Sequence, residues 1–374
     1  MSRYRFALAA PEDDGELRRL LAAMSMSGTI ALRMEREPSY FAAAAVDGRF
    51  RQTLVVRDGS GAGRIVGLAS RSVSERYVNG TPLPIGYLSN LRVLPEHRRG
   101  AVLARGYAFL RELHADGRAR LYLTTIAQGN TPALAALTSA RAGLPLYQPA
   151  GRYYTAALSL SRARQPAATT GAAGLQIRAC LAGDLPSLLE FLRSQGPRRQ
   201  FFPQYGESDF FQPDGLLRDL AADDLLLAFR EGQIVGTLAA WNQTAFRQNV
   251  IHRYGMPLRW LRPVYNLWAP LRGTPRLPRP GAPLRCLMGT LPLTAEDDRA
   301  VFGALLDAQL ARCAGKGWDY LLLGTHESDP MLPELRRYPA HWYTTCVYLV
   351  CWDDGQDLLR SLDQRPPYLE LGSL

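Results

Sequence analysis

The sequence predicts an α/β protein built from two similar domains in tandem. The chain has 374 residues, a length that suits two domains of ordinary size. Hydrophobic residues make up 47% of it and charged residues 21%, so each half can bury a globular core. The two halves also repeat one order of predicted strands and helices, which indicates a duplicated architecture.

The sequence of the first half predicts one α/β domain, over residues 1–160. Residues 4–24 read as a strand followed by a helix that places Leu17, Leu20 and Leu21 on one face. A long connection leads to a hairpin that turns on glycines. From there on, the predicted elements are the hairpin at 53–73, a strand at 87–94, a helix at 103–116, a strand at 121–126, a helix at 132–142 and an aromatic, β-branched strand at 153–160.

The second half, residues 175–355, repeats this order. Its hairpin carries QIVGTLA where the first hairpin carries RIVGLA. Residues 161–174 are small, polar and rich in Pro and Gly, which predicts a linker, and residues 356–374 form a C-terminal tail. The predicted elements of this half are strand and helix 175–192, hairpin 225–243, helix 301–314, strand 320–324 and strand 343–352.

Cysteine, histidine and hydropathy patterns exclude several classes of protein. The five cysteines form no CxxC pair and the five histidines show no metal-ligand spacing, so we expect reduced cysteines and no metal. No run of about 18 apolar residues occurs, and the apolar stretch 6–10 is too short for a signal-peptide core. We therefore expect a soluble, cytoplasmic protein.

Residues 87–113 carry the pattern that most strongly indicates a binding site. A predicted strand ends at Pro95, and an Arg/Gly turn then leads into a helix. The first turn of a helix presents unpaired backbone N–H groups and the positive end of the helix dipole, which together bind phosphate. Arg98 and Arg99 add positive charge, and Gly100 lets the backbone turn closely. The segment therefore predicts a site for a phosphate-bearing ligand.

This segment resembles the LxVxPxxR core of the Gcn5-related N-acetyltransferase (GNAT) superfamily, through Leu91, Val93, Pro95 and Arg98. The resemblance covers residues 1–160 and implies a mixed, mostly antiparallel sheet flanked by helices. It also implies transfer of an acyl group from acetyl-CoA or another acyl-CoA to an amine. The cofactor-binding residues that it implies are Leu91, Arg92 and Val93 beside pantetheine, Arg98, Arg99, Gly100, Ala101, Val102, Leu103 and Ala104 at the pyrophosphate, and Asn130 after the next strand.

Two positions depart from the family pattern. One of the two glycine positions of the turn is lost. Ser139 stands where the family often has a tyrosine that protonates the leaving thiolate, which makes Tyr147 the nearest substitute. Glu75 and Tyr87 are the candidates for the base that deprotonates the amine. These departures keep an alternative open, a catalytically inactive protein that senses acyl-CoA or binds an anionic surface.

The second half has the same layout without the phosphate-binding turn. Glu296, Asp297 and Asp298 stand at the start of the corresponding helix. Acidic side chains there suit the helix dipole but repel a pyrophosphate. We therefore expect one acyl-CoA site per chain, in the first half, and a degenerate second half.

A basic, aromatic insertion at 244–285 interrupts the second half. The net charge of the chain is +10, and no Asp or Glu occurs between Gly232 and Ala295. Four interpretations remain open: a lid over an amine acceptor with an anionic group, a peripheral membrane contact, a nucleic-acid contact, and a packed segment with solvated arginines. The excess charge lies in one segment rather than over the face of a domain, which disfavours nucleic acid.

Overall fold

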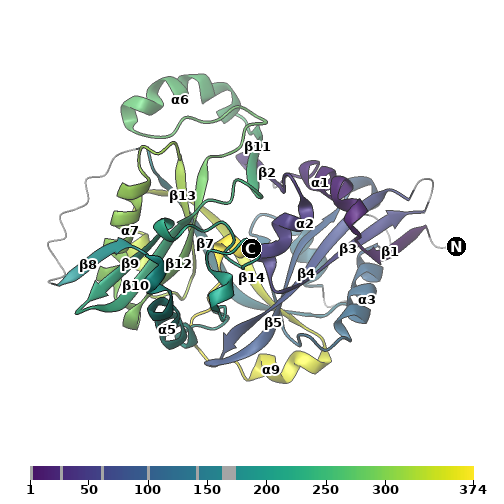
Figure 1. Ribbon diagram of the computed structural model, residues 1–374. Coiled ribbons are helices and arrows are strands. Elements are labelled where there is room, and N and C mark those ends of the chain that lie inside the picture. The colour runs from purple at the N-terminus through teal and green to yellow at the C-terminus, as the bar shows by residue number, and fades with distance from the viewer. Residues whose placement is uncertain (1–2, 26–27, 60–62, 99–101, 140–142, 162–173) are drawn as a thin grey trace.

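The computed structural model describes residues 3–25, 28–59, 63–98, 102–139, 143–161 and 174–374 (Figure 1). The strands of the first half are β1 (Tyr4–Leu8), β2 (Ile30–Glu35), β3 (Phe50–Asp58), β4 (Ile65–Val78), β5 (Thr81–Val93), β6 (Tyr122–Ala127) and β7 (Leu146–Ser159). Its helices are α1 (Asp14–Ala22), α2 (Tyr40–Ala43), α3 (Val102–His114) and α4 (Thr131–Leu137).

The second half repeats the order that the sequence predicted, except that its extra strand and helix follow the hairpin, whereas β2 and α2 of the first half precede it. Its strands are β8 (Leu175–Ala179), β9 (Leu225–Arg230), β10 (Gln233–Trp241), β11 (Gln248–Tyr254), β12 (Cys286–Thr294), β13 (Tyr320–His326) and β14 (Ala340–Cys351). Its helices are α5 (Leu185–Gln195), α6 (Leu258–Arg272), α7 (Arg299–Cys313), α8 (Leu332–Leu335) and α9 (Gln356–Arg360). The long connections that the sequence left undivided contain β2, α2, β11 and α6.

The strands form one large, mostly antiparallel sheet that runs through both halves. Among the described residues the strand order is β1-β3-β4-β5-β6-β14-β7-β13-β12-β10-β9-β8, and β2 pairs separately with β11. Helices cover both faces of the sheet. In β9, Leu225 and Leu227 pack in the cluster that contains α5, whereas Leu226 and Ala228 pack with α7. This alternation explains why β9 is apolar at successive positions. The predicted fold class is confirmed.

The two halves exchange their last strands. β14, from the second half, pairs with β6 on one side and with β7 on the other, and β7 continues the sheet to β13 of the second half. The two strands cross the centre of the molecule (Figure 1). The ranges 1–160 and 175–355 therefore mark the repeat in the sequence, but neither half completes its part of the sheet by itself. The tail 356–374 contains α9 and then packs back toward the centre.

The basic insertion also links the halves. β11 pairs antiparallel with β2 of the first half, where Ile251 faces Leu32. α6 follows β11 and projects from one end of the molecule (Figure 1). No helix within the described ranges has both the length and the apolarity needed to cross a bilayer.

Candidate functional site

β5 and β6 run parallel and then separate, which opens a gap in the sheet. They pair only at Gly86 with Tyr122 and at Tyr87 with Leu123, although β5 continues to Val93 and β6 to Ala127. A mostly apolar cavity of about 990 Å³ occupies this β5–β6 gap and the space between the two halves. That volume is at the upper end of the usual range for ligand sites, about 300–1,000 Å³.

The backbone of β5 turns donors toward the β5–β6 gap. Asn90 has a positive φ of 54°, and the register with β4 shifts between Leu68 and Ser70, which marks a β-bulge. The N–H of Leu94 donates to the Val66 carbonyl on β4. Because successive residues of a strand present their backbone groups to opposite sides, the N–H of Val93 faces the gap. A ligand in the gap can therefore extend the sheet along β5.

The predicted cofactor-binding residues divide into three groups. Those that line the cavity are Leu91, Arg92, Val93, Val102, Leu103 and Asn130. Asn130 also caps α4, since its side-chain oxygen accepts from the Ala133 N–H. Arg98 and Ala104 are exposed and lie outside the cavity lining, and Arg98 donates from Nε to the Val93 carbonyl at 3.0 Å. Arg99, Gly100 and Ala101 lie outside the described residues.

Tyr87 and Tyr147 both line the cavity as protonated phenols. The Tyr87 hydroxyl lies 2.9 Å from Thr125 Oγ1, and burial raises the pKa of Tyr87 to about 12. The Tyr147 hydroxyl hydrogen-bonds that of Tyr107, and burial raises the pKa of Tyr147 well above its ordinary value. At neutral pH these groups can donate a proton, but they cannot serve as bases. Tyr87 therefore suits proton donation better than the role of base.

Glu75 is not part of the site. It is exposed and pairs with Pro84 in the β4–β5 ladder. This pair lies near the start of β5, whereas the gap opens toward the end of β5. Its carbonyl accepts the Gln204 N–H, and it is absent from the described cavity lining. The sequence placed it near the site because β4 flanks β5, but the gap opens at the other end of β5.

Two groups of the kind that serve as bases line the cavity where the sequence did not place them. Among the described lining residues these are the carboxylate of Glu35, on β2, and the imidazole of His341, on β14. Glu35 pairs with Arg33 Nε at 3.1 Å, and the His341 ring meets that of Tyr320 edge to face. Neither lies in a motif. β2 falls in an undivided connection, and β14 belongs to the other half of the sequence.

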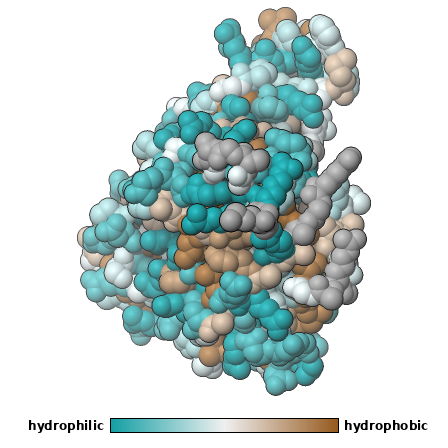
Figure 2. Space-filling model, turned by 90° about the vertical axis from the view of Figure 1, so that its right-hand side faces the viewer, coloured by the Kyte–Doolittle hydropathy of each residue, from teal (hydrophilic) through white to brown (hydrophobic). Residues whose placement is uncertain are grey.

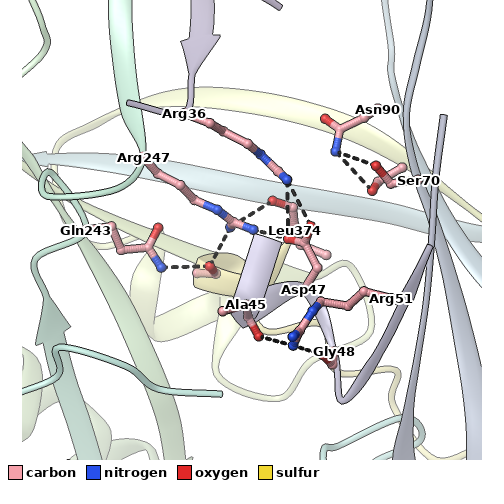
Figure 3. A network of polar contacts seen from close by, with 12 residues as sticks. Arg36, Ala45, Asp47, Gly48, Arg51, Ser70, Asn90, Gln243, Arg247 and Leu374 are labelled. Atoms are coloured by element: carbon pink, nitrogen blue, oxygen red, sulfur yellow. Dashed lines mark hydrogen bonds and ion pairs between the residues drawn. The ribbon is translucent and has the colours of Figure 1, made fainter. Parts of the chain in front are cut away.

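A buried charged network forms another part of the wall (Figure 3). Arg36 Nη2 donates to Asp47 Oδ2 at 3.0 Å, and Arg247 from the second half donates to the same carboxylate. Arg247 and Gln243 also donate to the Gly372 carbonyl, at 2.8 and 2.7 Å. Burial lowers the pKa of Arg247 to about 10, which leaves it charged at neutral pH. Two guanidinium groups thus converge on Asp47 beside the cavity.

The second half retains the bulge but fills the corresponding gap with its own tail. β12 and β13 pair in parallel from Cys286 to Met288, and Leu291 has a positive φ of 54°. Glu370 accepts the Leu291 N–H at 3.1 Å and the Tyr368 hydroxyl at 2.6 Å. At the start of α7, Asp298 accepts the N–H groups of residues 300 and 301. These contacts occupy the donors that a ligand would need, and so favour a single site per chain.

Replacing Glu370 by Gln should stabilise the protein more at pH 7.5 than at pH 5. Burial raises the pKa of Glu370, so the fold prefers its neutral form. The stability that this preference contributes is complete below the unfolded pKa and is lost as the pH rises toward the folded pKa. Glu370→Gln removes the charge and keeps the acceptor. The free energy of unfolding of the variant relative to the parent should therefore increase by up to about 1.4 kcal/mol for each unit that the pH rises. Urea unfolding of both proteins across this range measures it, and a difference independent of pH would contradict it.

Comparisons with known proteins give matches at the level of structure. No family model and no curated protein matches the sequence. The GCN5-related glucosamine N-acetyltransferase region of a fungal multi-domain β-N-acetylglucosaminidase has a TM-score of 0.62 and 12% identity, over 93% of this chain and 38% of that one. A tandem GNAT protein of the clavulanic acid biosynthesis pathway has a TM-score of 0.53 and 13% identity, over 92% and 98%. N-myristoyltransferase of Saccharomyces cerevisiae with bound myristoyl-CoA has a TM-score of 0.56 and 12% identity, over 94% and 79%.

Proposed function

Because the chain has the tandem GNAT-type fold that its motif predicted, we propose that it transfers an acyl group from acyl-CoA to an amine. The observation that carries the proposal is the β5–β6 gap, where parallel strands separate around a cavity and the backbone of Val93 faces the opening. Acyl-CoA would supply the thioester whose carbonyl carbon the amine attacks. Leu91, Arg92 and Val93 would hold its pantetheine arm along β5.

The residues of the cavity wall suit the proton transfers that this reaction requires. The attacking amine must lose a proton, and Glu35 and His341 are the described lining residues that carry a suitable base. The carbonyl oxygen gains negative charge, and backbone N–H groups that face the gap can stabilise it. The sulfur leaves as a thiolate, to which the neutral phenol of Tyr147 or Tyr87 can donate a hydrogen bond.

The size and lining of the cavity favour an apolar substrate larger than acetyl. The cavity of about 990 Å³ is mostly apolar and extends beyond the gap to residues of β2, β11 and β14. The structural neighbour N-myristoyltransferase of Saccharomyces cerevisiae has bound myristoyl-CoA, which supports a long acyl chain as the transferred group. The nearby Arg36 and Arg247 favour an acceptor that also carries an anionic group.

A second function, binding of acyl-CoA without catalysis, is favoured by one observation. Ser139, at the position of the family tyrosine, donates its hydroxyl to the Ala136 carbonyl and is absent from the described cavity lining. Transfer of radiolabelled acyl groups from acetyl-, octanoyl- and myristoyl-CoA to a panel of amines separates the two functions. Turnover supports the enzyme, whereas tight binding of a thioester without turnover supports the sensor.

Val93→Pro should weaken acyl-CoA binding about tenfold and leave the fold intact. Proline removes the N–H that faces the gap, and one lost hydrogen bond costs about 1–1.5 kcal/mol. Proline is tolerated in a strand where its nitrogen has no ladder partner. Calorimetry should give one site in the parent protein. In the control Leu94→Pro, the lost N–H donates to Val66, so this variant should be destabilised. Unchanged affinity in Val93→Pro would remove β5 from the binding site.

A further inference from the structure

α6 presents an apolar face to solvent. Trp260, Val264, Leu267 and Leu271 are spaced i, i+4, i+7 and i+11, which places them on one stripe of the helix. Leu261 and Trp268 flank this stripe. All six side chains are between 52% and 77% exposed. A surface helix of a globular protein normally turns its polar side outward, so this face is the reverse of the usual pattern.

The opposite face of α6 already supplies the packing that holds the helix. Leu258 and Tyr265 line the cavity, and Ala269 is buried. Asn266 accepts the Leu277 N–H at 2.7 Å and donates to the Leu277 carbonyl at 3.0 Å. Arg262 donates to the Pro278 carbonyl. The exposed stripe therefore makes no contact that the packing of α6 requires.

Exposed arginines lie on α6 and on the segments that adjoin it in the chain. Arg253, Arg259, Arg276 and Arg279 are exposed, and none of them forms an ion pair with another described residue. Residues 232–295 contain no Asp or Glu that could neutralise them. α6 projects from one end of the molecule, and hydrophobic and hydrophilic residues lie together at that tip (Figures 1 and 2).

We propose that α6 docks on the surface of a lipid bilayer that contains anionic lipids. The stripe enters the boundary between headgroups and acyl chains, with its two tryptophans at headgroup level. The arginines around it face anionic headgroups. This positive charge favours an anionic bilayer over a second copy of the chain, because a second copy would bring like charges together across the same face. At 15 residues, α6 lies on the bilayer and does not span it.

Docking in this way would bring the cavity to the bilayer surface. The inner face of α6 and the segment 277–278 form part of the cavity wall, while the outer face would contact lipid. An apolar acyl chain or acceptor could then pass from the bilayer to the cavity without crossing water. The docking itself does not rest on the proposed acyl transfer, so each can fail without the other.

Vesicle sedimentation of the full chain tests the proposal. We expect binding to phosphatidylcholine vesicles that contain phosphatidylglycerol, at least about tenfold weaker binding without it, and weakening by added salt. The variant Trp260→Ser/Leu267→Ser/Trp268→Ser should lose binding and keep its melting temperature, because its substituted side chains are exposed. The control Leu8→Ser/Leu181→Ser changes two exposed apolar residues elsewhere and should bind like the parent.

A second variant keeps the test decisive if the serine variant does not fold. Arg259→Glu/Arg276→Glu/Arg279→Glu should abolish the preference for anionic vesicles. The proposal is overturned if the parent binds neither kind of vesicle, or if both variants bind like the parent. It is also overturned if sedimentation velocity shows that the parent forms a dimer through this face, with the serine variant monomeric and vesicle binding absent from both.

Discussion

Residues 1–160 produced alone are expected to fail to fold, although they contain every element of the predicted first domain. In the full chain β7 pairs only with β13 and β14 among the described strands, and both belong to the second half. The fragment leaves β7 without a partner and β6 with an open edge. The core around Tyr107 and Tyr147 also loses Val350 and Trp352, each worth about 1.5–3 kcal/mol of burial. Circular dichroism and thermal unfolding should show no cooperative transition.

Cutting the chain after it has folded provides the matched control. A protease site inserted within 162–173 and cleaved in the folded protein should leave the two pieces associated, with acyl-CoA binding retained. The exchanged strands β7 and β14 would still be paired with their neighbours. A cooperative unfolding transition in isolated 1–160 would show instead that the halves are independent domains.

Asp47→Asn is expected to lower the free energy of unfolding by about 3–5 kcal/mol. Asp47 is buried and accepts hydrogen bonds from Arg36 and Arg247, whose side chains are themselves almost fully buried. Asparagine keeps the shape but leaves two buried guanidinium groups without a counter-charge, and this is the costly way to break a buried ion pair. Urea unfolding of the parent and the variant measures the loss.

An exposed ion pair serves as the comparison for Asp47. Asp357 pairs with Arg360 on α9, where both side chains are mostly exposed, so Asp357→Asn should cost no more than about 1 kcal/mol. Adding Arg247→Gln to Asp47→Asn should recover part of the loss, since it removes one of the two unpaired charges. If Asp47→Asn costs no more than Asp357→Asn, the network does not hold the two halves together.

The strand-turn-helix segment and the element order were readable because they depend on local patterns. Pro95 ends β5, leucines recur at helical spacing in α1, and RIVGLA recurs as QIVGTLA in the second half. The same local chemistry identified Leu91, Val93 and Asn130, which line the cavity. Of the three acidic residues that were expected to suit the start of this helix, Asp298 caps α7.

The sequence misplaced Glu75 because a base must be near the gap in space, not in sequence. Glu75 lies on a strand next to β5, yet at the end of that strand where β5 and β6 have not separated. Glu35 and His341 are distant from the motif along the chain, and both line its cavity. No periodicity or spacing connects these positions, because the contacts that join them are between strands.

The sequence by itself determined the duplicated α/β architecture, the GNAT-type motif and the basic, aromatic character of 244–285, since each is carried by neighbouring residues. Only the tertiary structure decided that β7 and β14 exchange places, that Glu370 fills the second gap, and that Arg36, Asp47 and Arg247 meet beside the first. It also decided that α6 turns its apolar stripe outward. The physical reason is that strand pairing and burial depend on residues far apart in the chain, whose packing competes across the whole molecule.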